Sequence, residues 1–225
     1  MVRFFDILLS MIALLLLSPI LMPIVIVLRG TGEGKIFFLQ ERVGRYQKKI
    51  RIIKFATMLE NSPNIGTGTI TTKNDPRILP VGKYLRKTKI NELPQLINIL
   101  IGDMSFIGPR PLTERNFNYY PSEYRKIITK VRPGLSGVGS VIFRNEEEIL
   151  NNQSEALGFY RDNIAPYKGE VEVWFEKKNG LTVYFILIAL TIWIVIMPKS
   201  NLIWRVFISL PPPPKILKQA LRRES

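Results

Sequence analysis

Residues 91–111 read NELPQLINILIGDMSFIGPRP, which combines an acid, an apolar helical repeat, a second acid and an arginine between two prolines. The recurrence of leucine and isoleucine at helical spacing predicts a helix with one face toward a core. Asn91 is expected to be its N-cap, and Pro94 falls in its first turn, where a missing N–H costs little. A core does not need this mixture of residues, whereas a site that holds a phosphate beside a metal ion does.

Two side chains of this stretch are candidates for chemistry, and each also has a purely structural explanation. Glu92 is expected at a helix N-terminus, where a carboxylate either stabilises the helix dipole or takes part in a site. Arg110 lies between Pro109 and Pro111, and its guanidinium suits bidentate phosphate binding as well as a structural ion pair.

The segments before this stretch supply further candidates. Residues 48–58 alternate enough to predict a strand that contains Lys54, although a charge on an edge strand would explain that residue too. Residues 61–74 are polar and rich in Gly and Thr, so we expect a loop or hairpin. Asp75-Pro76-Arg77 reads as a turn, and a basic helix that contains Arg86 is expected to follow it.

The segments after it are less distinctive. PGLSGVGS (133–140) is expected to be a glycine-rich turn. Residues 181–197 form an apolar run without charges that is marginal for crossing a bilayer, so an interfacial or core helix and a membrane span are both considered. The tail after PPPP (211–214) is basic, and is either a solvated end or a contact with anionic lipid.

The N-terminal segment is predicted to associate with a membrane. Residues 4–28 are almost wholly apolar, with Asp6 as the only charge, and crossing a bilayer takes about 20 such residues. Ser18-Pro19 and Pro23 predict either a kinked transmembrane helix or a helix broken at Ser18-Pro19 that returns to the same face. The excess of Lys and Arg over residues 29–54 places the following domain in the cytoplasm.

Composition limits the partners and the chemistry. Lys and Arg number 32 against 18 Asp and Glu, so the formal net charge is +14 and an anionic partner is expected. No nucleic-acid partner is predicted, because no recognition helix or RNA-binding motif accompanies the charge. The chain has no Cys and no His, which excludes thiolate zinc sites and imidazole bases. Any metal is therefore expected to be a hard cation bound through oxygen, with Mg²⁺ first.

The chain resembles a bacterial sugar transferase, that is, a monotopic polyprenyl-phosphate phosphoglycosyl transferase. The segments that carry the resemblance occur in order: the apolar helix with Ser18-Pro19, FFLQERVG (37–44), KFATM (54–58), NDPRILPVGKYLRK (74–87), NELPQLINILIGDMSFIGPRPL (91–112) and VRPGLSG (131–137). In such a family the broken helix is re-entrant. The resemblance therefore implies a protein on the cytoplasmic face of the bacterial inner membrane.

The resemblance also implies an activity. Such an enzyme transfers a sugar 1-phosphate from a nucleotide sugar, usually a UDP-sugar, to polyprenyl (undecaprenyl) phosphate in the presence of Mg²⁺. This step starts the assembly of a surface glycan. Membrane lipid, the UDP-sugar and the polyprenyl phosphate are thus the implied partners, while a homodimer and the identity of the sugar are left open.

The implied roles fall on particular residues of this chain. Glu92 takes the metal-binding position of an Asp-Glu pair, and Asn91 stands at the position of the nucleophilic Asp. Arg110 matches an arginine that contacts phosphate. Four further residues match positions near the substrate or supporting it: Lys54, Asp75, Arg77 and Arg86.

Three departures from the family pattern leave the mechanism open. A neutral Asn91 cannot attack phosphorus as a carboxylate does. Ala56 stands at the position of an Arg, and Tyr184 and Ile186 stand at the positions of an Asp and a Lys. The nucleophile could therefore lie elsewhere, at Glu92, Asp103 or an acid of residues 146–148. Alternatively, transfer could be direct, or the protein could be a catalytically silent relative that binds the lipid carrier or nucleotide sugar.

The expected fold class is α/β or α+β. It consists of a broken, re-entrant N-terminal membrane helix and a small helix-rich cytoplasmic domain with few short strands and amphipathic interfacial helices. The expected parts are residues 1–29 for the membrane helix and 30–180 for the catalytic domain. Residues 181–225 are expected to form an apolar or interfacial helix and a basic tail.

Overall fold

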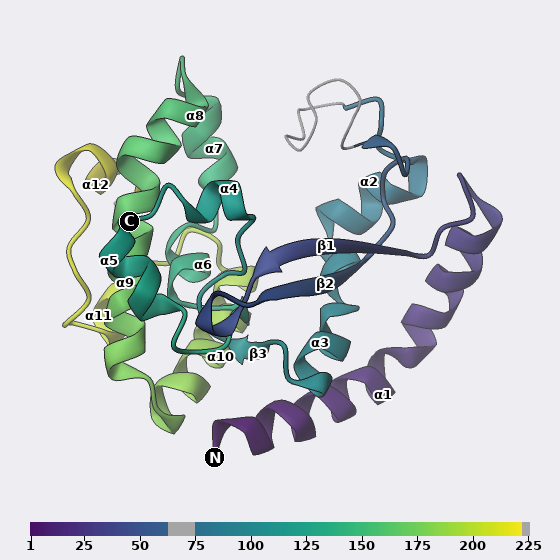
Figure 1. Ribbon diagram of the computed structural model, residues 1–225, viewed down its shortest axis with the longest axis horizontal. Helices are drawn as coiled ribbons and strands as arrows, with labels where there is room; N and C mark the ends of the chain where they lie inside the picture. The colour runs from purple at the N-terminus through teal and green to yellow at the C-terminus, as the bar shows by residue number, and fades with distance from the viewer. Residues whose placement is uncertain (63–74, 222–225) are drawn as a thin grey trace. The chain divides into compact units, whose positions relative to one another are not determined.

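The computed structural model describes residues 1–62 and 75–221 (Figure 1). Within these residues the chain is a helix-rich α+β protein with four short strands in two separate two-stranded sheets, which confirms the expected class. The loop or hairpin expected for residues 61–74 lies almost wholly outside the described residues, as does Asn74.

The elements follow one another along the chain with these bounds: α1 (Val2–Gly30), β1 (Phe37–Val43), η1 (Arg45–Gln47), β2 (Lys49–Phe55), α2 (Pro80–Lys87), η3 (Ile90–Glu92), α3 (Gln95–Ile101), β3 (Ser105–Ile107), α4 (Glu114–Phe117), α5 (Ser122–Ile128), β4 (Gly134–Ser136), α6 (Val138–Ile142), α7 (Glu146–Asn151), α8 (Ala156–Phe159), the π-helix η4 (Tyr160–Ile164), α9 (Ala165–Lys178), α10 (Leu181–Ile196), α11 (Leu202–Val206) and α12 (Lys215–Leu221).

The chain forms two compact units. Unit 1 comprises Met1–Phe4, Arg42–Ile50 and Gly102–Ser225, and unit 2 comprises Phe5–Glu41 and Arg51–Ile101. The strands β1 and β2 form a hairpin closed by η1, and parts of this hairpin belong to each unit.

The first helix is continuous, contrary to the expected break at Ser18-Pro19. It is α-helical throughout, and Figure 1 shows a ribbon that changes direction along its length without interruption. Pro19 has no N–H to donate to the carbonyl of Leu15, but the hydroxyl of Ser18 donates to that carbonyl at 2.7 Å. The side chain of Ser18 thus supplies the donor that Pro19 lacks. By length and composition α1 is the one described helix that could cross a membrane.

The core of unit 2 forms where the second half of α1 meets the hairpin and α2. Leu28, Phe55 and Leu85 are buried together, and partly buried apolar side chains of α1 and α2 pack around them. The predicted strand at residues 48–58 and the predicted basic helix are both confirmed, as β2 and α2. Burial of these apolar side chains stabilises the unit by about 25 cal/mol for each Å² removed from water.

Unit 1 is built around α9, an element that sequence periodicity did not single out. Its buried side chains include Tyr167, Val171 and Phe175, and it packs against α5, α6 and η4. The short strands β3 and β4 pair in parallel, and β3 contacts α10. PGLSGVGS is therefore not a turn, because it contains β4 and the start of α6.

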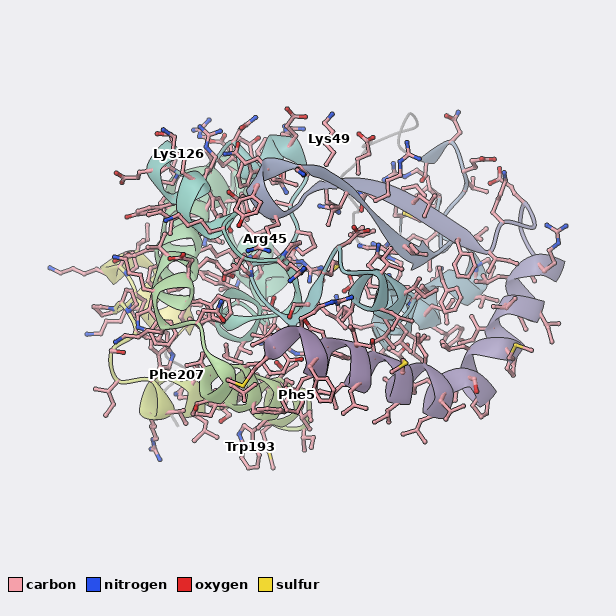
Figure 2. All side chains as sticks on the ribbon, turned by 60° about the horizontal axis from the view of Figure 1, so that its bottom comes forward. Phe5, Arg45, Lys49, Lys126, Trp193 and Phe207 are labelled. Atoms are coloured by element: carbon pink, nitrogen blue, oxygen red, sulfur yellow. The ribbon has the colours of Figure 1, made fainter. Side chains whose placement is uncertain are left out.

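The apolar run at residues 181–197 is confirmed as a helix, α10, whose two faces differ. Tyr184, Leu187, Leu190 and Ile194 are buried against unit 1. The other face exposes large apolar side chains, among them Ile192, Trp193 and Ile196. In Figure 2 Trp193 lies at the lower edge and Lys126 of α5 at the upper edge.

The C-terminal segment (residues 199–221) packs back on α9. The hydroxyl of Tyr167 donates to the carbonyl of Pro211 at 2.7 Å, and the indole N–H of Trp174 donates to Ser209 Oγ at 3.1 Å. Leu217 of α12 is fully buried. The described part of the basic tail is therefore attached to unit 1.

Candidate active site

Lys54 and Glu92, predicted separately, form an ion pair in unit 2. Lys54 Nζ lies 3.5 Å from Glu92 Oε1, and each side chain is 16% exposed. Lys54 comes from β2 and Glu92 from η3, just before α3. A partly buried carboxylate with a cation beside it is suited to binding a metal–phosphate group, because water screens its charge only in part.

Asn98 of α3 brings these two elements together. Its side chain is 1% exposed, accepts from the N–H of Ile53 at 2.9 Å and donates to the carbonyl of Arg51 at 2.8 Å. These bonds join α3 to the backbone of β2 immediately before Lys54. Asn98 is therefore a positioning residue, and its only sequence signal is that it is polar within the apolar run QLINILI.

Asn91 is not the helix N-cap that the sequence predicted. It lies inside the 3₁₀ turn η3, and its Oδ1 is buried and accepts no hydrogen bond from the residues that the structure describes. An unsatisfied buried carbonyl oxygen costs about 1–3 kcal/mol. This oxygen, next to Glu92 in the chain, therefore has unused capacity to accept a hydrogen bond among the described residues.

Asp75 and Arg77 form a buried pair with a structural role. Arg77 Nε donates to Asp75 Oδ1 at 2.8 Å, and Arg77 Nη1 donates to the carbonyl of Ser62 at 2.6 Å. Leu79 N–H also donates to the carbonyl of Thr57 at 3.0 Å. The motifs KFATM and DPRILPVG are thus joined through their backbones.

Gly82 and Arg86 belong to α2, which continues from this junction. A Cβ on Gly82 would collide with the carbonyl oxygen of Thr57, so only glycine allows this close approach. Arg86 Nη1 lies 3.7 Å from Met58 Sδ. Unit 2 therefore brings together Lys54 with Glu92 and Asp75 with Arg77, and places Arg86 against the end of KFATM.

Arg110 belongs to unit 1, where it follows β3. The N–H of Gly108 donates to the carbonyl of Ser136 at 2.9 Å, and the N–H of Gly134 donates to the carbonyl of Pro109 at 2.8 Å. A Cβ on Gly108 or Gly134 would collide with the opposite backbone. The motifs GPRP and VRPGLSG therefore pair directly, and this pairing fixes the backbone that carries Arg110.

A small cavity of about 20 Å³ lies beside Arg110. It is also lined by Tyr120 and by Glu172 of α9, and Glu172 is 3% exposed. Burial is the main reason that the pKa values of Tyr120 and Tyr160 are raised above the usual tyrosine range. Glu172 was missed by sequence reasoning, because nothing in PYKGEVEVWFEKK separates this buried acid from the exposed Glu170 and the half-buried Glu176.

The described residues contain no group of three acidic, histidine or cysteine side chains arranged for a metal. The oxygen donors of Glu92 and Asn91 nevertheless fit Mg²⁺, which proteins usually bind through one or two side chains together with substrate phosphates and water. A metal here would take most of its ligands from the substrate.

A long apolar helix, a half-buried Lys–Glu pair and a proline-flanked arginine fit a membrane protein that handles phosphorylated compounds. The family model of bacterial sugar transferases matches residues 1–198, and the chain belongs to this family.

Three relatives show the range of similarity. Over 182 residues the chain is 36% identical to UDP-glucose:undecaprenyl-phosphate glucose-1-phosphate transferase of Escherichia coli, covering 77% of this chain and 37% of that protein. It is 34% identical over 158 residues to exopolysaccharide production protein ExoY of Sinorhizobium fredii, covering 64% and 70% of the two chains. It is 40% identical over 145 residues to UDP-N-acetylgalactosamine-undecaprenyl-phosphate N-acetylgalactosaminephosphotransferase of Aeromonas hydrophila. This match covers 62% of this chain and 33% of that protein. The chain thus spans little more than a third of the Escherichia coli relative.

Proposed function

We propose that this protein transfers a sugar 1-phosphate from a UDP-sugar to undecaprenyl phosphate on the cytoplasmic face of the inner membrane. The observation that carries the proposal is the Lys54–Glu92 pair, held by Asn98 on the segment that also bears Asn91. The names of the relatives support the substrate classes, and the excess of cationic residues suits two phosphorylated substrates.

In the proposed reaction a nucleophilic oxygen attacks the phosphorus that bears the sugar. The bond from this phosphorus to UMP breaks, UMP leaves, and the sugar 1-phosphate is joined to the attacking group. Glu92 and Asn91 would hold Mg²⁺, which when bound neutralises phosphate charge. Lys54 offsets the negative charge of the phosphate groups beside Glu92. Arg110 binds a phosphate through the paired N–H donors of its planar guanidinium.

The attacking group distinguishes two versions of the reaction. In one, undecaprenyl phosphate attacks directly, because Asn91 cannot form a covalent bond to phosphorus as a carboxylate would. In the other, an acid elsewhere in the chain first takes the sugar phosphate. The buried and unsatisfied Oδ1 of Asn91 favours the direct version, because it marks Asn91 as a group that binds rather than reacts.

A silent relative that binds the lipid carrier or the nucleotide sugar is the second candidate function. The observation in its favour is Asn91 itself, a neutral residue beside Glu92. Such a protein would keep the phosphate-binding residues and would lack turnover.

The experiment that tests the proposal measures UMP release by the purified protein with a panel of UDP-sugars, undecaprenyl phosphate and Mg²⁺. We expect release with at least one UDP-sugar, and a loss of about 10²-fold or more in Glu92→Ala. Glu114→Ala, which removes an exposed acid of α4, is the matched control and should retain turnover. No release by the natural protein, together with release by Asn91→Asp, would contradict the proposal and establish the silent relative.

A further inference from the structure

Glu172 has an unusual environment for an acid that no proposed step uses. The side chain projects from the middle of α9 into unit 1 and is almost completely buried. Its carboxylate accepts a hydrogen bond from the N–H of Gly139, and a Cβ on Gly139 would collide with Oε1. Glycine at position 139 is therefore needed for Glu172 to reach this place.

The second oxygen of Glu172 has no partner. Oε2 is buried and accepts no hydrogen bond from the residues that the structure describes. Lys168, one turn earlier on α9, pairs with Glu146 and lies 5.1 Å from the centre of the Phe143 ring. An unsatisfied carboxylate oxygen is costly in an apolar interior, so a polar partner from outside the chain would stabilise it.

The cavity that Glu172 lines limits what that partner can be. Its volume of about 20 Å³ holds one group the size of a water molecule. Arg110 lines the same cavity and is exposed to solvent. A ligand that fits both would combine an anionic group for the guanidinium with one small polar group for the carboxyl. Nucleotide sugars have this chemistry, because their ribose and hexose hydroxyls lie close to phosphates.

We infer that Glu172 and Arg110 form a subsite for the nucleotide sugar, in which Arg110 binds a phosphate and the free oxygen of Glu172 shares a hydrogen bond with one ligand hydroxyl. This inference rests on the proposed function and adds a specificity-determining residue to it. A hydroxyl group fits the cavity. Glu172 therefore selects the ligand by one hydroxyl.

The ionisation of Glu172 gives the subsite a pH dependence. Burial raises the pKa of Glu172 to about 7, although Lys168 and the N–H of Gly139 act in the opposite direction. The other charged or titratable groups around it are Arg110, Tyr120, Glu146 and Tyr160. A bound phosphate further disfavours the ionised carboxylate, so the protonated acid is the form that binds, and it donates to the ligand hydroxyl.

The test is calorimetric titration of the full-length protein with the UDP-sugar that supports turnover, at pH values of about 6 and about 8, which lie on either side of the Glu172 pKa. We expect the natural protein to bind several-fold more tightly at the lower pH. Glu172→Gln keeps a hydrogen-bond donor but cannot ionise, so its affinity for the UDP-sugar should be the same at both pH values. Glu172→Met cannot form the hydrogen bond and should bind about tenfold more weakly at the lower pH. Glu170→Gln, an exposed acid on the same helix, is the control and should behave as the natural protein.

The outcomes separate the two proposals. A folded Glu172→Met variant that binds as tightly as the natural protein would overturn the subsite, and so would a Glu172→Gln variant that keeps the natural pH dependence. If no UDP-sugar supports turnover and none binds at either pH, the proposed function fails together with the subsite. If the Glu172→Met variant also binds UDP alone more weakly, the hydroxyl that Glu172 contacts belongs to the ribose. If the Glu172→Met variant loses affinity only for the UDP-sugar, the hydroxyl belongs to the sugar.

Discussion

At the scale of single residues, hydrogen bonds from side chains to the backbone help to position the site. Asn98 illustrates this, because its amide replaces two backbone partners of β2 and thereby fixes α3. Lys54 and Glu92 could each be predicted as candidates from the sequence. Their pairing could not, because it depends on the contact that Asn98 makes about 45 residues away along the chain.

We predict that Asn98→Leu lowers the stability of the protein by a few kcal/mol. The substitution keeps approximately the size of the side chain but leaves the N–H of Ile53 and the carbonyl of Arg51 buried without partners, at about 1–3 kcal/mol each. Thermal unfolding in detergent should show a melting temperature lower by roughly 5–15 °C.

The control for this change is Asn151→Ala at the exposed end of α7, which should alter the melting temperature little. Equal melting temperatures for Asn98→Leu and the natural protein would show that α3 is held on β2 by other contacts.

At the scale of elements, local patterns predicted α2, α10 and the strand β2, but they missed α9 and β4. The apolar run at 181–197 and the basic segment before residue 88 have helical patterns that need no distant partner, and both are helices. PGLSGVGS was predicted as a turn from its glycines. Two of them, Gly134 and Gly137, instead permit close backbone contact with Gly108, a partner that no local pattern reveals.

The behaviour of α1 in a membrane is a prediction at this scale. The chain has no cysteine, so a single cysteine introduced at Val2 can be labelled selectively. If α1 is re-entrant, a membrane-impermeant maleimide should label this cysteine only from the cytoplasmic side, as it should a cysteine at Glu33. Replacing Ser18 and Pro19 together by Ala restores an ordinary helical hydrogen bond and should move the label at Val2 to the periplasmic side.

Labelling at Val2 from the periplasmic side in the protein with Ser18 and Pro19 intact would contradict re-entry and establish a span. The cysteine at Glu33 serves as the control, because it should stay on the cytoplasmic side in every variant.

At the scale of the whole molecule, charge is distributed unevenly. Residues 177–221 contain no acid and six cations, namely Lys177, Lys178, Lys199, Arg205, Lys215 and Lys218. The same part of the chain exposes the apolar face of α10. Composition alone predicted an anionic partner, and this stretch of unit 1 combines exposed apolar side chains with cations and no acid.

We predict that turnover depends on anionic lipid through this region. Each Lys near an anionic surface contributes about 1 kcal/mol to its attraction. Turnover in vesicles with phosphatidylglycerol should exceed turnover in phosphatidylcholine vesicles several-fold, and Lys215→Gln/Lys218→Gln should reduce this ratio.

The matched control is Lys126→Gln/Lys130→Gln, which removes two charges from the end of α5, because Lys126 lies at the edge of Figure 2 opposite Trp193. If both double variants change the ratio of turnover in the two kinds of vesicle equally, the dependence on residues 177–221 is contradicted.

The parallel pairing of β3 with β4 also has a consequence for the order of synthesis. The backbone before Arg110 is fixed by Ser136, so this loop cannot settle until that residue has left the ribosome. Because the chain grows by about 5–20 residues per second, α1 emerges on the order of ten seconds earlier. The apolar helix α1 can therefore reach a bilayer before the loop that carries Arg110 is complete, so this loop would mature on a chain that is already at the membrane.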